Sequence, residues 1–224
     1  MNTKLTRTFL VSLTCAALVV GGAFAGVLTY GYRQPEYITM PADPSSSAPV
    51  LINSSHILDP GYVPPDLESI YGRGGRAFSL STADLELSSY VLDAAIEMFA
   101  AARDDGVTGY IITSAYRSYE RQSELYAKDP YSRKVAPPGA SEHQSGLAID
   151  IWSDDYPNDF AATVHWEWIR ANCARFGFIV RYPEDKTHIT GIVFEPWYLR
   201  YVGREAAREI MSRGICLEEY IHPS

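Results

Sequence analysis

The sequence of 224 residues has few cysteines and no excess of basic charge. It holds 19 lysines and arginines against 27 acidic residues, and this net charge of −8 argues against a nucleic-acid partner, which needs a clustered basic face. Of the three cysteines, Cys173 and Cys216 lie in the body of the chain, and their spacing has no zinc-finger character. The composition, 46% hydrophobic and 21% charged, excludes a disordered, collagenous or coiled-coil protein.

Acidic residues are missing from the first 33 positions, which contain Lys4, Arg7 and Arg33. Residues 9–30 form an uncharged run, and a helix of that length spans roughly 33 Å, enough to cross a hydrocarbon core of about 30 Å. Positive charge ahead of the run predicts a cytoplasmic N-terminus and an exported body. We therefore expect residues 1–33 to be a transmembrane anchor and the protein to be a single-pass protein of the cell membrane.

A cleavable signal peptide is the alternative to an anchor. Ala23-Phe24-Ala25 fits an A-x-A cleavage site, so cleavage at about Ala25 would release a secreted protein. Both alternatives place the body outside the cytoplasmic membrane.

The rest of the chain divides into a linker and one domain. Residues 34–55 include a Pro- and Ser-rich stretch and predict a flexible tether, and residues 56–224 predict the folded domain. In an exported domain, Cys173 and Cys216 could form a disulfide, or they could be two buried thiols.

Hydrophobic periodicity predicts an α+β domain with a small, mainly antiparallel sheet flanked by helices. We expect helices over residues 84–103 (capped by Ser81 or Thr82), 118–127, 161–175 and 204–213. Strands are expected over residues 110–114, 147–152 and 178–182, followed by a hairpin that turns at Thr190-Gly191. Prolines over residues 130–139 mark a long loop of the kind that often carries binding residues.

Residues 141–150, with the sequence SEHQSGLAID, form the densest polar motif. His143 lies on a loop, and Asp150 follows seven residues later on the predicted strand. Gly146 lets the backbone bend between them, so both side chains can point at one metal ion. A carboxylate inside an apolar strand is costly unless it is paired or metal-bound, which favours a role for Asp150 over an ordinary surface position.

Two further clusters suggest hydrolysis. Glu195 lies at the end of an apolar stretch and could act as a general base on a metal-bound water, or it could be an acid paired with Arg200. Arg117 lies where a strand passes into a helix, and there it could hold a substrate carboxylate through a bidentate pair or be an ordinary loop residue.

Taken in order, the three clusters resemble the zinc D-alanyl-D-alanine carboxypeptidases of the VanY and VanX type. The family patterns are S-x-Y-R-S, S-x-H-x-x-G-x-A-x-D and E-x-W-H-x-R-Y-V-G. Residues 114–118 and 141–150 match the first two fully, and residues 195–203 match the third except at one position.

The resemblance implies that His143 and Asp150 are ligands of one Zn²⁺ ion and that Glu195 activates water. It also implies that Arg117 binds the terminal carboxylate, with Ser141 and Gln122 as further substrate contacts. The reaction implied is removal of the terminal D-alanine from a peptidoglycan stem peptide, which would be the partner.

Tyr198 stands where the family places its third zinc ligand, a histidine. A phenol is a poor ligand at neutral pH because its pKa is near 10, although a metal ion lowers the pKa of a bound group. Tyrosinate could coordinate zinc, or His188 could substitute from the predicted hairpin. In a third case the protein binds wall peptides without zinc and without catalysis. An L,D-carboxypeptidase or endopeptidase specificity is also open.

Overall fold

The computed structural model of the chain describes residues 34–41, 48–154 and 159–223. The predicted membrane anchor over residues 1–33 lies outside these ranges. Within them, no helix is both long enough and apolar enough to cross a membrane.

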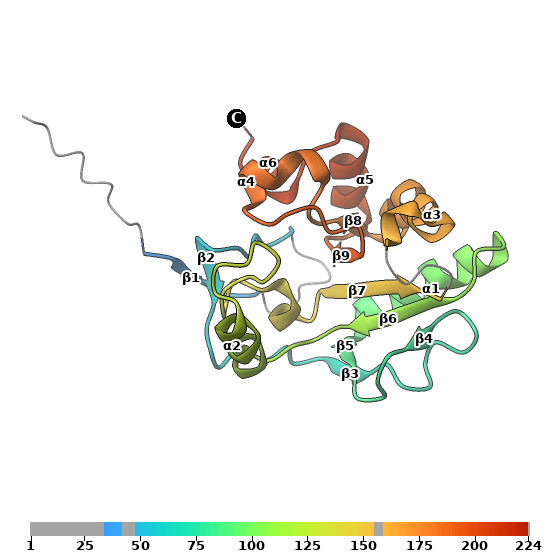
Figure 1. Cartoon of the computed structure of the whole chain (residues 1–224), viewed down its shortest axis with the longest axis horizontal. Helices are drawn as coiled ribbons and strands as arrows, with labels where there is room; N and C mark the ends of the chain where they lie inside the picture. Colours follow the sequence, from blue (N-terminus) through green and yellow to red (C-terminus); the bar gives the residue numbers. More distant parts are fainter. Residues whose placement is uncertain (1–33, 42–47, 155–158, 224) are drawn as a thin grey trace, which may run out of the picture. The chain divides into compact units, whose positions relative to one another are not determined.

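A five-stranded sheet forms the centre of the domain (Figure 1). Its strands run in the order β4 (Ser79–Leu80), β6 (Tyr110–Ser114), β7 (Ala148–Ser153), β9 (Tyr198–Tyr201) and β8 (Phe178–Val180). Only β4 and β6 are parallel; the other three pairs are antiparallel. The predicted α+β domain with a small, mainly antiparallel sheet is confirmed.

Helices surround this sheet. They are α1 (Ser89–Asp104), α2 (Tyr119–Lys128), α3 (Val164–Asn172), α4 (Thr187–Thr190), α5 (Arg204–Arg213) and α6 (Leu217–Ile221). The described residues also form the 3-10 turns η1 (Glu142–Ser145), η2 (Phe160–Ala162), η3 (Cys173–Phe176) and η4 (Glu184–Lys186). In Figure 1, α5 and α6 lie at the β8–β9 end of the sheet. Ser118 caps α2 as expected, because its side chain accepts a hydrogen bond from the Arg121 N–H.

The first predicted helix begins later than its apolar spacing suggests. Residues 86–88 form β5 (Glu86–Ser88), which pairs with β3 (Leu67–Ser69), and α1 starts at Ser89. Its cap comes from Asp66, whose carboxylate accepts from the Ser89 N–H at 3.1 Å and from the Ser89 hydroxyl at 3.2 Å. The expected caps Ser81 and Thr82 are therefore wrong, because the capping group is distant in sequence.

The predicted hairpin at Thr190-Gly191 is also wrong. Residues 187–190 form α4, and Gly191, with φ +76°, ends this helix by donating its N–H to the Thr187 carbonyl. The chain then runs without regular structure until β9 begins at Tyr198. A glycine that closes a helix has the same positive φ as a glycine in a hairpin turn, which explains the error.

The predicted tether over residues 34–55 is wrong where it is described. β1 (Glu36–Ile38) pairs in parallel with β2 (His56–Leu58), so residue 56 lies inside a folded region. The side chains of Met40, Leu51 and Ile52 are buried in the domain. Residues 42–47 of the predicted tether lie outside the described ranges.

Cys173 and Cys216 are both free and buried, so the alternative of two buried thiols holds in this structure. Cys173 packs in the main core beneath the sheet, among apolar side chains of α1, α3 and β8. Burial raises the pKa of the Cys173 thiol to about 12 and that of Cys216 to about 11, which leaves both thiols protonated at neutral pH.

Candidate active site

His143 and Asp150 approach each other at the start of β7. The Nδ1 atom of His143 lies 2.7 Å from the Ala115 carbonyl, which only accepts, so in neutral imidazole Nδ1 carries the proton. Nε2 then presents a lone pair 3.3 Å from Oδ2 of Asp150. With the neutral imidazole, two acceptors face each other and make a place for a cation, and a carbonyl behind Nδ1 is the usual support of a metal-bound histidine.

Gly146 allows this approach. It has φ +69°, and a Cβ built there would lie 2.8 Å from the Ser88 hydroxyl oxygen. The glycine closes η1 and turns the chain into β7, so His143 and Asp150 face the same side.

Arg117 lies between β6 and α2, with both ends of its guanidinium engaged. Nη1 donates to Oε1 of Gln122 at 2.9 Å, and Nη2 donates to the Ser114 hydroxyl at 2.7 Å. Nη2 is also 3.7 Å from Oδ2 of Asp150. The arginine is thus fixed at the edge of the His143–Asp150 pair, with N–H groups left for an anionic ligand.

Gln122 is buried and uses both ends of its amide inside the protein. While Oε1 accepts from Arg117, Nε2 donates to the Ala136 carbonyl at 2.6 Å. This arrangement makes Gln122 a brace between Arg117 and the loop of residues 129–140.

Glu195 and Tyr198 come from the turn before β9 and from its first residue. Tyr198 is the cross-strand partner of Asp150, and its ring centre lies 4.9 Å from that of His143. Its hydroxyl is buried without a hydrogen-bond partner among the described residues. Burial raises the pKa of Tyr198 well above 10.

Glu195 is 5% exposed. Its burial, together with the charge of Asp150, raises its pKa to about 8, while Lys134 and Arg117 oppose the rise. A carboxyl group with a pKa near neutrality can accept and return a proton at physiological pH.

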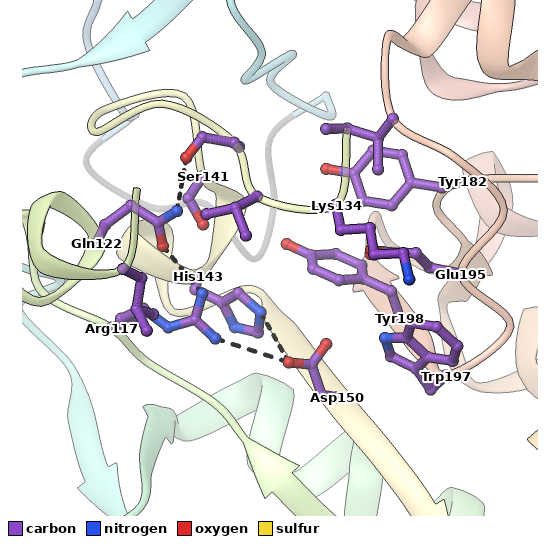
Figure 2. A pocket seen from close by; sticks show the side chains of 14 residues that line it. Arg117, Gln122, Lys134, Ser141, His143, Asp150, Tyr182, Glu195, Trp197 and Tyr198 are labelled. Carbon is purple, nitrogen blue, oxygen red and sulfur yellow. Dashed lines mark hydrogen bonds and ion pairs between the residues drawn. The ribbon is translucent and has the colours of Figure 1, made fainter. Parts of the chain in front are cut away.

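All seven site residues expected from the sequence line one cavity of about 210 Å³ (Figure 2). They are Arg117, Gln122, Ser141, His143, Asp150, Glu195 and Tyr198. Their individual roles stay predictions. His188, the alternative third ligand, is exposed and does not line the cavity, because the hairpin that would have placed it there is absent.

The cavity also has lining residues that were not among the expected site residues. Lys134, Tyr182 and Trp197 line it from three separate segments (Figure 2). The ring of Tyr182 packs 4.9 Å from the ring of Tyr198. Lys134 belongs to the proline-rich loop, which was the one sequence signal for it.

Within the described residues, no three His, Cys, Asp or Glu side chains lie close enough together to hold a metal ion. His143 and Asp150 supply two donors, and a third donor in this cavity has to be of another type. The buried hydroxyl of Tyr198 meets that description.

A family model described as VanY, D-alanyl-D-alanine carboxypeptidase, matches residues 84–204. This range contains every residue of the cavity. The chain belongs to the VanY family.

Curated relatives agree with this VanY assignment. A D-alanyl-D-alanine carboxypeptidase of Enterococcus faecalis is 43% identical over 155 residues, covering 62% of this chain and 55% of the relative. The putative carboxypeptidase YodJ of Bacillus subtilis is 35% identical over 181 residues, covering 76% of this chain and 65% of the relative. The chain spans between 55% and 65% of the length of the curated relatives it matches.

Solved structures show the same VanY fold. The LdcB LD-carboxypeptidase superimposes with a TM-score of 0.67 at 35% identity, covering 76% of this chain and 84% of that one. A D,D-pentapeptidase VanY from a VanB-type resistance cassette, solved with Zn(II), has a TM-score of 0.62 at 37% identity, covering 77% and 98%.

Proposed function

We propose that the protein is a zinc-dependent D-alanyl-D-alanine carboxypeptidase that removes the terminal D-alanine from peptidoglycan stem peptides. The observation that supports this most is the meeting of the His143–Asp150 pair, Glu195 and Arg117 in one cavity. Relatives described as D-alanyl-D-alanine carboxypeptidases, and a VanY structure in complex with D-alanine-D-alanine, supply the substrate class.

The residues fit a zinc ion through a mixed donor set. His143 would give a nitrogen, Asp150 a carboxylate oxygen and Tyr198 a phenol oxygen. Oδ1 of Asp150 and the Tyr198 hydroxyl are buried without hydrogen-bond partners among the described residues, a costly state that a cation would relieve. Bound zinc would supply a Lewis acid for the scissile carbonyl and lower the pKa of a water.

The chain's own residues would divide the remaining work. Arg117 would hold the terminal carboxylate of the peptide and so place the last peptide bond over the cavity. Glu195 would accept a proton from the attacking water as the oxygen of that water bonds to the carbonyl carbon. It would return that proton to the amine as the carbon–nitrogen bond breaks, which releases D-alanine.

The shape of the cleft suits a peptide longer than a dipeptide. A second cavity of about 170 Å³ shares Val135, Ala136, Tyr182 and Ile192 with the first. The preceding residues of a stem peptide could lie there while its end lies against Arg117.

Two other functions each have an observation in their favour. The first is a wall-peptide binding protein without zinc and without catalysis. The raised pKa of the Tyr198 phenol favours it, because a protonated phenol is a poor zinc ligand. An L,D-carboxypeptidase is favoured by the similarity to LdcB, whose TM-score of 0.67 exceeds that of the VanY structure.

We also propose that residues 1–33 hold the domain on the outer side of the cell membrane, with secretion after cleavage near Ala25 as the alternative. The charge pattern of the sequence supports it. N-terminal sequencing of the protein from membrane and medium fractions tests the two: an intact N-terminus in the membrane fraction supports the anchor, and a new N-terminus near residue 26 in the medium contradicts it.

The enzyme proposal is tested with the full chain purified in detergent. Bound zinc is measured by mass spectrometry, and D-alanine release is followed from a pentapeptide ending in D-Ala-D-Ala and from the tetrapeptide that lacks the last residue. We expect release from the pentapeptide that depends on zinc and is lost in Glu195→Ala. Release from the tetrapeptide alone would indicate the L,D-activity, and peptide binding without zinc or release would indicate the binding protein.

A further inference from the structure

Beneath the cavity lies a buried network of four charged side chains. Oε1 of Glu142 is 2.7 Å from both Nε of Arg181 and Nη1 of Arg200. Arg181 also donates both ends of its fork to Glu218, at 2.7 and 2.9 Å. Glu142 and Arg200 are 0% exposed, Arg181 is 1% and Glu218 is 9% exposed. Two cations and two anions thus form one neutral buried group.

Such a network contributes little net stability. Burying charged groups costs free energy because they lose their contacts with water, and the attraction between the charges does little more than offset that cost. Apolar residues of similar volume often stabilise a fold better. A buried network is better explained by the geometry that it fixes, so its neighbours indicate its role.

Each of three members is close in sequence to a residue that lines the cavity. Glu142 lies between Ser141 and His143 in η1. Arg181 precedes Tyr182 directly. Arg200 comes two residues after Tyr198 and so lies on the same face of β9. The Glu142–Arg200 pair therefore connects the turn that carries His143 to the strand that carries Tyr198.

The network also reaches segments outside residues 84–204. Nη2 of Arg200 donates to the Val50 carbonyl at 3.0 Å, and Nδ2 of Asn53 donates to Glu218 at 3.4 Å. Glu218 itself lies on α6, near the end of the chain. Residues 50–53 and α6 are thereby joined to the turn at His143 through the side chains of the network.

We propose that Glu142 is a positioning residue: anchored by Arg181 and Arg200, it fixes the backbone of η1 and so sets the direction in which His143 faces Asp150. The inference rests on the proposed function for the reaction that His143 serves. It makes residues 50–53 and α6 part of the supporting structure of the site.

The test compares Glu142→Gln with Ile210→Ala in the full chain purified in detergent. Ile210 is buried in α5, in an apolar cluster with Leu51 and Leu217, and is not a member of the ion-pair network, so its truncation lowers stability through lost packing alone. The readouts are urea unfolding, zinc affinity, and the ¹⁵N imidazole signals of His143 in the zinc-free protein at neutral pH.

For Glu142→Gln we expect the Nδ1–H tautomer of His143 to be lost or broadened and zinc affinity to fall about 10- to 100-fold, as for other residues that orient a metal ligand. Ile210→Ala should lower stability and leave both other readouts unchanged. Unchanged imidazole signals and zinc affinity in Glu142→Gln would overturn the proposal and leave the network a purely structural one.

Glu218→Gln is the second variant, used if Glu142→Gln does not fold. It removes one anion from the far side of Arg181, and the proposal expects the same change in the His143 signals to a smaller degree; no change overturns it. Wild-type protein that releases no D-alanine would refute the proposed function, while the imidazole signals would still decide the role of Glu142.

Discussion

At the scale of single residues, the site differs from its family pattern in one donor, Tyr198. The phenol is buried, has no hydrogen-bond partner among the described residues and has a pKa raised well above 10. To coordinate zinc as phenolate it must lose its proton at a cost set by that pKa, whereas a neutral imidazole nitrogen can bind without such a loss. Under the proposed function, the identity of residue 198 should therefore control how firmly the ion is held.

We predict that Tyr198→His raises the affinity for zinc about 10-fold or more, because burial favours the neutral phenol, whereas a neutral imidazole binds without losing a proton. D-alanine release at limiting zinc should rise with it. Isothermal titration with zinc and the release assay measure both quantities. Tyr182→His is the matched control, since Tyr182 lines the same cavity 4.9 Å away. An equal gain in both variants would contradict a specific role for position 198.

At the scale of secondary-structure elements, the site depends on a sharp turn between η1 and β7. Gly146 has the positive φ that this turn needs, and its carbonyl accepts a hydrogen bond at 3.2 Å from the N–H of Ser88, the residue before α1. The strand register also matters, because it pairs Asp150 with Tyr198 across β7 and β9. Motif spacing alone could predict the first of these features, since the glycine lies between the two proposed ligands.

We predict that Gly146→Ala destabilises the domain by more than the about 1–2 kcal/mol that a left-handed conformation costs an alanine. The new Cβ would also lie 2.8 Å from the Ser88 hydroxyl. Gly72→Ala isolates the first cost, because Gly72 has φ +77° and nothing within 4 Å of an added Cβ. Urea unfolding measures both variants. Equal losses of stability would show that the contact with Ser88 is relieved at no cost.

Sequence patterns predicted the elements whose signals are local. Ser118 is a cap next to its own helix, and residues 110–114 are a β-branched strand, so both were predicted correctly. The start of α1 was not, because Asp66 caps it from 23 residues away. Tyr182 and Lys134 also line the cavity but were not predicted as site residues: the long loop was the one signal for Lys134, and Tyr182 reaches the cavity through its packing against Tyr198.

At the scale of the whole molecule, the Glu218–Arg181 ion pair of α6 makes stability depend on pH, because breaking the pair would leave a buried charge without a partner. Burial by itself would raise the pKa of Glu218, but Arg181 outweighs it and holds the pKa below the ordinary glutamate value. The stabilisation is therefore present above the pKa of an unfolded glutamate, and it is lost as the pH falls through the lower folded value.

We predict that Glu218→Gln lowers the free energy of unfolding at neutral pH and makes its decline below the pKa of an unfolded glutamate shallower than in the wild type. Urea unfolding at several pH values measures this. Glu209→Gln is the control, because Glu209 lies on α5 and its pair with Arg213 is about half exposed and screened by solvent. A decline in Glu218→Gln as steep as that of the wild type would assign the acid sensitivity to other groups.

The last prediction concerns the start of the folded domain. The sequence pattern predicted it at residue 56, whereas the structure shows buried residues before that position. Met40, Leu51 and Ile52 are buried, and burying such a side chain is worth roughly 1.5–3 kcal/mol. Their joint loss, on the order of 5–9 kcal/mol, is comparable to the whole stability of a typical domain, about 5–15 kcal/mol.

A fragment of residues 56–224 should therefore lack a cooperative thermal transition by near-ultraviolet circular dichroism. A fragment of residues 34–224 should retain it, and one of residues 48–224, which keeps Leu51 and Ile52, should melt in between. If the 56–224 fragment melted like the 34–224 fragment, residues 34–55 would be dispensable for folding, as a tether would be.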